Sequence, residues 1–321
     1  MVIIENLFLN TSKICNKYGF KEKEVKSIFN KRKGKRSYNL FLEDYTLNPY
    51  MGCSFDCVYC YINGSKYAKE THDFYVKSNA KELIHNSLKR KFKNHEKALL
   101  NLGSASDPYM DIEKELFLTR DILKTFLKFK YPVHIITKSD LILRDVDILD
   151  KINDKAIMPD DLEDKLKSKV IISFSFSTID DEIAKIMEPN APLPSERLKT
   201  IKELSKRDYT VGVAFMPLLP FLSDSDSKLY KAIKIFSENN VEYVLPGGLS
   251  LFGENNSSSR VKYFETLRKH FNKDLEKTEN LFFNEKKQKY EEYLSSQYHY
   301  NIFKKISKYC SEYNIQTTII K

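Results

Sequence analysis

Three of the five cysteines in this chain lie close enough in sequence to hold a metal group together. Cys53, Cys57 and Cys60 follow the spacing Cys-x3-Cys-x2-Cys within eight residues. Thiolates are the usual ligands of a [4Fe-4S] cluster, and a cluster held by only three of them leaves one iron open to a substrate or cofactor. The spacing therefore predicts an iron–sulfur site whose open iron carries the chemistry.

Zinc and disulfides are the other roles open to such cysteines. A structural zinc site takes four ligands, typically as two separated pairs, but no second Cys-x2-Cys follows and His72 stands alone in a polar stretch. A disulfide framework is typical of short secreted chains with an even number of cysteines. Cys15 and Cys310 are expected to be buried or incidental. A non-catalytic, zinc-binding nucleic-acid module remains the alternative to the iron–sulfur site.

The cysteines belong to a series of short motifs. Its members are Asn48–Tyr61, with the pattern Asn-Pro-Tyr-x-Gly-Cys-x3-Cys-x-Tyr-Cys-Tyr, then Gly103–Tyr109, Ile136–Ser139 and Met187–Pro192. In this order they resemble the radical S-adenosylmethionine enzymes, and within them the spore photoproduct lyase-like group, often labelled DNA repair photolyases. The resemblance covers about residues 30 to 250.

The resemblance implies both the cofactors and the reaction class. In this family the amino and carboxylate groups of S-adenosylmethionine chelate the open iron of a [4Fe-4S] cluster. One electron from the reduced cluster then cleaves the cofactor to a 5′-deoxyadenosyl radical, which abstracts hydrogen from the substrate. The expected protein is therefore a lyase-like radical enzyme whose particular reaction is undefined.

Six strand-and-helix units follow one another from residue 45 onward. Short apolar runs predict strands at Tyr45–Pro49, Ala98–Gly103, Val133–Thr137, Val170–Phe176, Thr210–Met216 and Val241–Leu245. Helical patterns lie between them at Asn79–His95, Glu113–Phe129, Asp145–Ile152, from Thr178, Glu196–Lys206 and Ser227–Glu238. Parallel strands need crossover connections of this kind, which predicts an α/β fold. The resemblance implies a partial (β/α)6 barrel with its chemistry at the C-terminal ends of the strands.

The chain is expected to divide into three parts. They are an N-terminal lead-in (1–44), the barrel (45–250) and a C-terminal helical extension (251–321). The lead-in is expected to pack outside the barrel and to contain a helix at Glu22–Phe29. The extension is expected to contain two amphipathic helices over residues 260–313 and a last short strand at Gln316–Ile320. Residues 154–168 are expected to form a polar insertion.

Polar residues follow several of the predicted strands. Ser106 and Asp107 come just after the second strand, Lys138 ends the third and Ser175 ends the fourth. A carboxylate can accept hydrogen bonds from an ammonium group or a ribose, and an ammonium group suits the cofactor's carboxylate. An ordinary polar strand end is the alternative for each residue. Their match to cofactor-contacting positions of the family implies that these residues bind S-adenosylmethionine.

Two tyrosines flank the last cysteine of the triplet. By resemblance, Tyr59 lies against the adenine of the cofactor; alternatively, Tyr59 and Tyr61 shield the cluster from water. Spore photoproduct lyases have a hydrogen-donating cysteine just before the Ser-Asp pair, whereas this chain has Ala105. Tyr61 is therefore predicted to take part of this catalytic role. The alanine favours a related reaction over the lyase reaction itself.

Three further features are assigned from the later motifs. Glu188 and Arg197 are expected to form a structural ion pair around the motif Glu-Pro-x-Ala-Pro. Phe215–Pro220 resembles the adenine-side wall of radical enzymes. Gly247-Gly248 lets the backbone approach a ligand closely, or makes a tight turn.

The charge of the chain bears on its substrate. The formal net charge is +9, but only nine of the 53 basic residues are Arg, and the composition is that expected of an AT-rich genome. The run Lys31–Arg36 stands apart by its density and is interpreted either as a solvated face or as a phosphate contact. A DNA or RNA substrate is expected from the resemblance and this run. A protein side chain or a small metabolite is the alternative.

The sequence also bears on location. No apolar run reaches the length of a membrane span, and residues 1–10 lack the pattern of a secretory signal. We therefore expect a cytoplasmic protein with no membrane partner. An electron donor such as ferredoxin or flavodoxin is expected to reduce its cluster.

Overall fold

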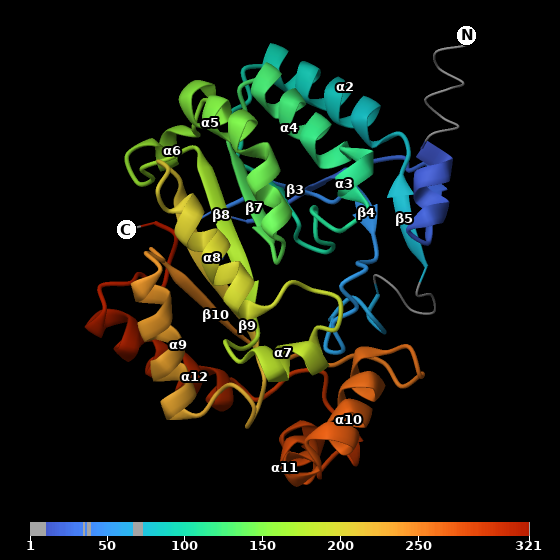
Figure 1. Ribbon diagram of the computed structural model, residues 1–321, viewed down its shortest axis with the longest axis vertical. Coiled ribbons are helices and arrows are strands. Elements are labelled where there is room, and N and C mark those ends of the chain that lie inside the picture. Colours follow the sequence, from blue (N-terminus) through green and yellow to red (C-terminus); the bar gives the residue numbers. More distant parts are fainter. Residues whose placement is uncertain (1–10, 35, 37–39, 67–72, 321) are drawn as a thin grey trace.

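A seven-stranded sheet forms the centre of the protein. The computed structural model describes residues 11–34, 36, 40–66 and 73–320, and the order of its main sheet is β10-β9-β8-β7-β6-β3-β2 (Figure 1). The strands are β2 (Phe29–Lys31), β3 (Tyr45–Leu47), β6 (Leu100–Leu102), β7 (Val133–Thr137), β8 (Val170–Phe176), β9 (Thr210–Leu218) and β10 (Val244–Gly248). In this sheet, β3, β6, β7, β8, β9 and β10 are parallel and lie in chain order, whereas β2 is antiparallel to β3.

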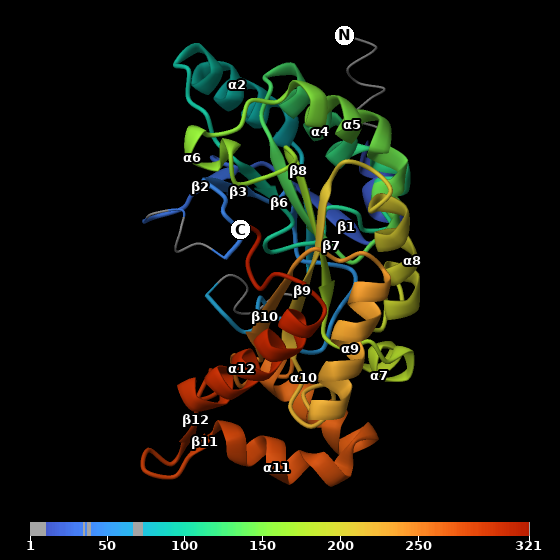
Figure 2. The same cartoon turned by 90° about the vertical axis from the view of Figure 1, so that its left-hand side faces the viewer.

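Helices connect the parallel strands. They are α2 (Ala80–Lys93), α3 (Glu113–Leu116), α4 (Leu118–Lys128), α5 (Val146–Lys155), α6 (Asp160–Glu163), α7 (Asp181–Met187), α8 (Pro194–Leu204) and α9 (Asp226–Glu238). Figure 2 shows α5, α8 and α9 along one side of the sheet, which is open between the edge strands β2 and β10. The predicted α/β fold and all six predicted parallel strands are confirmed. In the described part of the chain, no helix has the length and apolar character needed to cross a membrane.

The lead-in forms strands where a helix was predicted. β1 (Phe20–Lys23) pairs with β5 (Phe74–Lys77), which also pairs with β4 (Tyr50–Met51). Phe20 is buried between the rings of Tyr50 and Phe74, and β2 follows within the main sheet. The predicted helix at Glu22–Phe29 is therefore wrong, because pairing with a strand far along the chain outweighs local helix propensity.

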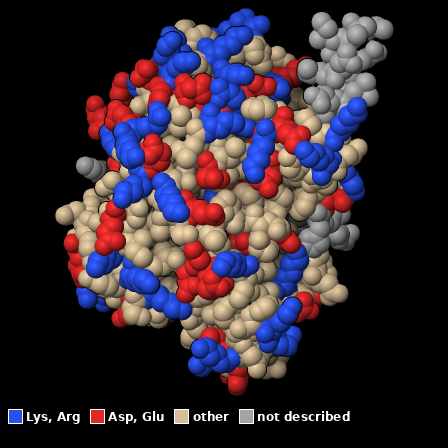
Figure 3. Space-filling view, viewed as in Figure 1, with Lys and Arg blue, Asp and Glu red and all other residues tan. Residues whose placement is uncertain are grey.

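The basic run lies at the end of the sheet opposite the cysteines. Lys31 pairs with Tyr45, the first residue of β3, whereas Cys53 follows the other end of that strand. Arg32 binds Glu43 at 2.9 Å, and Arg36 binds carboxylates of Asp44 and Asp161. Lys35 lies outside the described residues. Basic and acidic side chains are also interspersed over the face in Figure 3, so neither sign dominates it.

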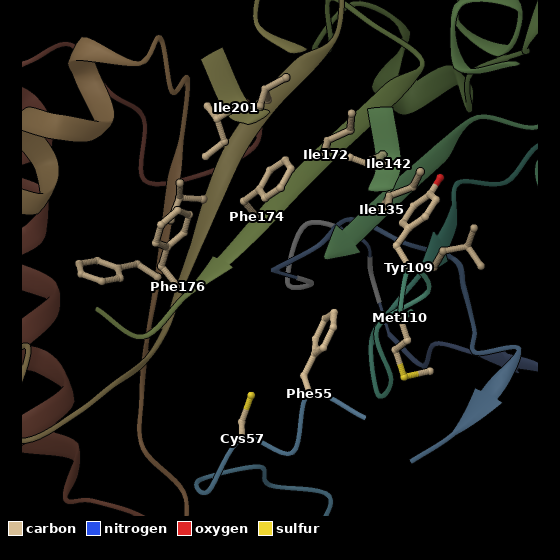
Figure 4. Packing of buried hydrophobic residues seen from close by; sticks show 14 of the residues in the cluster. Phe55, Cys57, Tyr109, Met110, Ile135, Ile142, Ile172, Phe174, Phe176 and Ile201 are labelled. Carbon is tan, nitrogen blue, oxygen red and sulfur yellow. The ribbon is translucent and has the colours of Figure 1, made fainter. Parts of the chain in front are cut away.

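Side chains of the central strands are buried on both faces. On β8, Ile172 and Phe174 pack toward α8 beside Ile201, as Figure 4 shows, whereas Ile171 faces a second apolar cluster. Burial on both faces explains why these strands are nearly continuous apolar runs. The second cluster also contains Met158 and Leu162. Residues 154–168 are therefore not simply a polar insertion, because their apolar side chains, with α6, cover the other face of the sheet.

The extension contains more elements than predicted. Its helices are α10 (Ser259–His270), α11 (Asn272–Phe282) and α12 (Ser296–Glu312), and a hairpin joins β11 (Phe283–Asn284) to β12 (Lys289–Tyr290). The predicted last strand is reduced to a bridge between Gln316 and Tyr243. The predicted helix at Glu113–Phe129 is divided at Phe117, whose φ is +54°. The division into lead-in, barrel and extension stays a prediction.

Gly103 lets the end of β6 approach the end of β7. Its φ is +96°, and a Cβ built there would lie 2.1 Å from the carbonyl oxygen of Ile136. A side chain would therefore meet both backbone strain and a fixed backbone atom. Gly34 has a similar φ of +91° but no atom within 4 Å of the added Cβ. The variant Gly34→Ala therefore measures the cost of the backbone conformation alone.

We predict that Gly103→Ala destabilises the protein much more than Gly34→Ala. The left-handed backbone alone should cost about 1–2 kcal/mol in either variant. The contact with Ile136 should bring the loss for Gly103→Ala to at least about 3 kcal/mol. Urea unfolding of the metal-free proteins measures both values, and equal losses would contradict the close approach.

Candidate active site

The three predicted cluster ligands lie in one loop at the C-terminal ends of the parallel strands. The loop follows β4, and Figure 4 shows Phe55 and Cys57 beyond the ends of the central strands, with the sulfur of Cys57 pointing toward them. The amide of Val58 donates to the carbonyl of Met187 at 3.0 Å, and the amide of Ser54 contacts the sulfur of Met110 at 3.1 Å. The loop is thus fixed between the segments that follow α7 and β6.

The thiols have the chemistry that a [4Fe-4S] cluster requires. Cys53, Cys57 and Cys60 are free, and burial raises the pKa of each thiol, to about 12 for Cys57. Cluster binding would therefore release protons from thiols held ready in one loop. Among the described residues, no three His, Cys, Asp or Glu side chains converge as they would on a single metal ion.

Lys138, Ser175 and Tyr59 are brought together as predicted. The ammonium group of Lys138 donates to the hydroxyl of Ser175 at 3.3 Å and lies 5.8 Å from the centre of the Tyr59 ring. Burial lowers the pKa of Lys138, but the charges of Cys57 and Glu188 more than offset this, so the pKa is raised. The lysine is therefore a half-buried cation beside the cysteine loop.

Asp107 lies at the same end of the sheet, but its carboxylate already accepts three hydrogen bonds from neighbouring groups. It accepts hydrogen bonds from the amide of Tyr109 at 2.9 Å, the hydroxyl of Thr137 at 2.8 Å and the amide of Lys138 at 2.7 Å. Burial raises the pKa of Asp107 even though these bonds favour the carboxylate. A carboxylate has about four acceptor sites, so little capacity is left for a ligand. Asp107 ties the end of β6 to the end of β7.

Ser106 points away from this group. Its hydroxyl donates to the carbonyl of Tyr50 at 3.1 Å, and the residue is buried. Sequence reasoning missed Asn48, whose side-chain oxygen accepts the amides of Ala105 at 2.9 Å and Ser106 at 3.4 Å. The signal for Asn48 was its position at the start of the cysteine motif.

Tyr61 reaches the loop that contains Ala105. Its hydroxyl donates to the carbonyl of Ser104 at 2.6 Å, and 43% of the residue is exposed. The hydroxyl thus lies one residue from the position where the related lyases carry their thiol. Of the two tyrosines, Tyr61 is the one with access from solvent, since Tyr59 is buried.

Glu188 fixes the position of the Tyr59 side chain by a hydrogen bond. Its carboxylate accepts the hydroxyl of Tyr59, accepts the hydroxyl of Ser177 at 2.6 Å and binds the guanidinium of Arg197. The predicted ion pair is therefore confirmed, and both side chains are almost completely buried. Burial alone would raise the pKa of Glu188, but the charges of Arg197 and Lys138 outweigh it and lower the pKa to about 2. Sequence reasoning missed the link from this pair to the cysteine loop.

The arrangement of the loop and strands agrees with a family comparison. The model of the radical SAM superfamily matches residues 47–233, which is more than half of the chain. This chain therefore belongs to the radical SAM superfamily and is an enzyme. The superfamily uses a [4Fe-4S] cluster and S-adenosylmethionine, so these are its cofactors, and the zinc-module alternative is wrong.

Proteins with similar sequences come from archaea, bacteria and a virus. An uncharacterized protein of Methanocaldococcus jannaschii is 29% identical over 227 residues, which is 70% of each chain. An uncharacterized protein of Acidianus two-tailed virus is 25% identical over 241 residues, or 70% of this chain and 72% of the viral protein. An uncharacterized protein of Mycobacterium tuberculosis is 26% identical over 222 residues, and the match covers 65% of this chain but 59% of that protein.

Solved structures share the fold. A mutant of spore photoproduct lyase has a TM-score of 0.63 at 14% identity, covering 91% of this chain and 78% of the lyase. A lyase mutant with bound AdoMet and dinucleoside spore photoproduct has a TM-score of 0.61 at 13% identity, with the same coverage. SuiB of Streptococcus suis has a TM-score of 0.51 at 12% identity, covering 84% of this chain and 47% of SuiB.

We predict that Arg197→Met destabilises the protein by about 3–5 kcal/mol, because it leaves a buried carboxylate without its cation. The double variant Glu188→Gln, Arg197→Met should recover much of this loss, since no charge then remains buried and unpaired. Urea unfolding is measured for the metal-free forms of the unmodified protein, Arg197→Met, Glu188→Gln and the double variant. It gives the four free energies of unfolding that the comparison needs. Strictly additive losses would contradict the coupling.

The same pair makes a prediction about pH. The pKa of Glu188 in the folded protein is about 2, below its ordinary value of 4.5. Its ionised form therefore contributes stability that is fully present above pH 4.5 and is lost as the pH falls toward 2. The unfolding free energy of Glu188→Gln should fall less steeply over this pH window than that of the unmodified protein.

Proposed function

We propose that this radical SAM enzyme holds its cluster through Cys53, Cys57 and Cys60 and acts on a nucleic acid. Lys138, Ser175 and Tyr59 are the proposed contacts for S-adenosylmethionine. Asp107 and Ser106 are proposed to shape the two strand-end loops around it rather than to provide its main polar contacts. This revises the sequence-based roles of the last two, because their polar atoms already bind other parts of the chain.

The reduced cluster, when bound, supplies the electron that splits S-adenosylmethionine into methionine and a 5′-deoxyadenosyl radical. The chain's own residues do the rest. The half-buried ammonium group of Lys138 supplies a cation for the cofactor's carboxylate. Glu188 fixes the Tyr59 ring beside that cation, and the ring's burial excludes water from the site. Tyr61 is proposed to donate hydrogen to the substrate radical in the absence of a thiol at residue 105.

The extent of the fold likeness carries the proposal of a nucleic-acid substrate. The family model ends at residue 233, whereas the likeness to spore photoproduct lyase covers 91% of this chain and so includes much of the extension. One of those lyase structures contains bound AdoMet and dinucleoside spore photoproduct. The likeness in fold over both the barrel and much of the extension supports a substrate of the same class.

The basic run does not support the nucleic-acid substrate. Arg32 and Arg36 are bound by carboxylates, and the run lies at the far end of the strands from the cysteines. It therefore cannot position phosphates next to the proposed cluster. This observation removes one of the two reasons for expecting DNA or RNA, so the nucleic-acid proposal rests on the fold likeness, and a protein side chain or small metabolite stays the alternative.

Cleavage of S-adenosylmethionine in the presence of candidate substrates tests the proposal. The anaerobically reconstituted and reduced protein should release 5′-deoxyadenosine, and single-stranded or damaged DNA or RNA should increase the rate. A rate unaffected by any nucleic acid but increased by peptides would overturn the substrate class. No 5′-deoxyadenosine under any condition would overturn the assignment of the site.

We predict that Ala105→Cys changes the outcome for spore photoproduct. The unmodified protein should not repair this lesion efficiently, because an alanine cannot return a hydrogen atom to the substrate radical. Repair by the cysteine variant alone would show that the pocket already accepts the lesion. Efficient repair by the unmodified protein would contradict the role assigned to residue 105, and Ala105→Ser is the matched control without a thiol.

We predict that Lys138→Met keeps the cluster but weakens binding of S-adenosylmethionine by about 1.5–3 kcal/mol, the range for a hydrogen bond to a charged group. Asp107→Ala should weaken it too, because loss of its bonds frees the backbone of Lys138. Ser106→Ala, whose hydroxyl faces Tyr50, should have the smallest effect. Anaerobic calorimetry gives the affinities, and an unchanged value in Lys138→Met would refute its role.

A further inference from the structure

The first helix of the extension contacts the cysteine loop directly. The ammonium group of Lys262 on α10 donates to Oδ1 of Asp56 at 3.1 Å. Asp56 lies between Cys53 and Cys57. At the N-terminus of the same helix, the amide of Ser259 donates to the carbonyl of Asn63 at 3.1 Å. Two contacts from one helix therefore bracket the part of the loop that carries the later cysteines.

Two glycines allow backbone to pack on backbone next to these contacts. Gly64 has a φ of +83°, and a Cβ there would lie 2.6 Å from the carbonyl oxygen of Phe252. Gly253 has a φ of +75°, and a Cβ there would lie 3.0 Å from the Cα of Gly64. The chain that leads into α10 thus sits against the end of the cysteine loop at a distance that only glycine permits.

Contacts from other segments add to the loop's own hydrogen bonds, and Asn190 also donates to the carbonyls of Ser54 and Phe55. The loop's own hydrogen bonds include one from the amide of Asp56 to Cys53 at 3.2 Å and one from the amide of Cys60 to Cys57 at 3.0 Å, each closing a turn. Asp56 has a φ of +46°, a left-handed conformation that costs an L-residue roughly 1–2 kcal/mol. Asp56, in the turn between Cys53 and Cys57, is thus held by Lys262 of α10, a helix outside the loop.

We propose that α10 is a clasp on the cysteine loop and that Lys262 is a positioning residue for the cluster. The proposal rests on the role of Cys53, Cys57 and Cys60 as cluster ligands. Lys262 fixes the turn that sets the first two thiols relative to each other. Its ammonium group also places positive charge beside the loop, which favours the reduced form of a bound cluster. The helix lies beyond the residues that the superfamily model matches, so the clasp is a feature of this chain's extension.

A substitution of Lys262 distinguishes an effect on the cysteine loop from an effect on the stability of the whole protein. The side chains of Lys262 and Asp56 are 22% and 44% exposed, and a pair this exposed contributes only about 0–1 kcal/mol to overall stability. Lys262→Met should therefore unfold at nearly the same temperature as the unmodified protein. Any change in the cluster would then report on the loop. Lys269→Met, which changes an exposed lysine of the same helix, is the matched control.

The experiment measures two properties of the reconstituted protein. The rate of iron loss to a chelator should rise several-fold in Lys262→Met, and the midpoint potential of the cluster should become more negative. Lys262→Arg should restore both, and Lys269→Met should change neither. Asp56→Asn weakens the same contact, because the ion pair becomes a hydrogen bond to a neutral acceptor, and it removes a negative charge, so it should speed iron loss while shifting the potential the other way.

Unchanged iron loss and an unchanged potential in Lys262→Met would overturn the clasp. If that variant instead unfolds at a lower temperature, Asp56→Asn decides the question, and normal iron retention there overturns the clasp as well. The variant with alanine at all three loop cysteines tests the underlying assignment by itself. Iron retained in that variant would mean that the cluster is held elsewhere.

Discussion

The site depends first on one buried carboxylate. Glu188 follows α7, binds Arg197 and accepts the hydroxyl of Tyr59, the residue next to Cys60. A carboxylate removed from water must be paired and hydrogen-bonded, because a buried charge without a partner costs several kcal/mol. Arg197 in turn donates to the carbonyls of Ser175 and Pro192 at 2.9 and 2.8 Å. One ion pair therefore fixes the cysteine loop to the end of β8.

The parallel sheet brings the remaining groups to the same place. β3, β6, β7 and β8 are neighbours in chain order, so the segments that follow them meet at one edge. Asp107, after β6, ties itself to Lys138 at the end of β7, and Lys138 reaches Ser175 at the end of β8. The ends of three strands, β6, β7 and β8, are thus joined by hydrogen bonds. This rigidity is what a site for a reactive cofactor needs.

The sequence predicted the barrel well because its strands are buried on both faces and its helices have one apolar side. Val170–Phe176 is such a strand and was found at its predicted bounds. The lead-in was mispredicted because β1 depends on a partner in β5, which no local pattern reveals. Residue types at the site were predicted, but their partners were not. Asp107 and Ser106 looked available for a ligand, and only the fold shows that Thr137 and Tyr50 already occupy them. The role of the basic run was mispredicted for a similar reason. The run is close to the cysteine motif in sequence, but in the fold the length of β3 separates the two.

The charges around the site suggest why both cofactors belong together. Arg197 is a buried cation and Lys138 a half-buried one, and Glu188 and Asp107 are buried acidic groups, so in their charged forms these four groups balance. An oxidised cubane with three thiolates carries one net negative charge, and S-adenosylmethionine carries one net positive charge. Either cofactor alone would leave the site with an unbalanced charge in a region of low dielectric, which is costly. Together they restore neutrality. Lys138, which donates to Ser175 and lies beside the Tyr59 ring, is the cation that we propose for the carboxylate of S-adenosylmethionine.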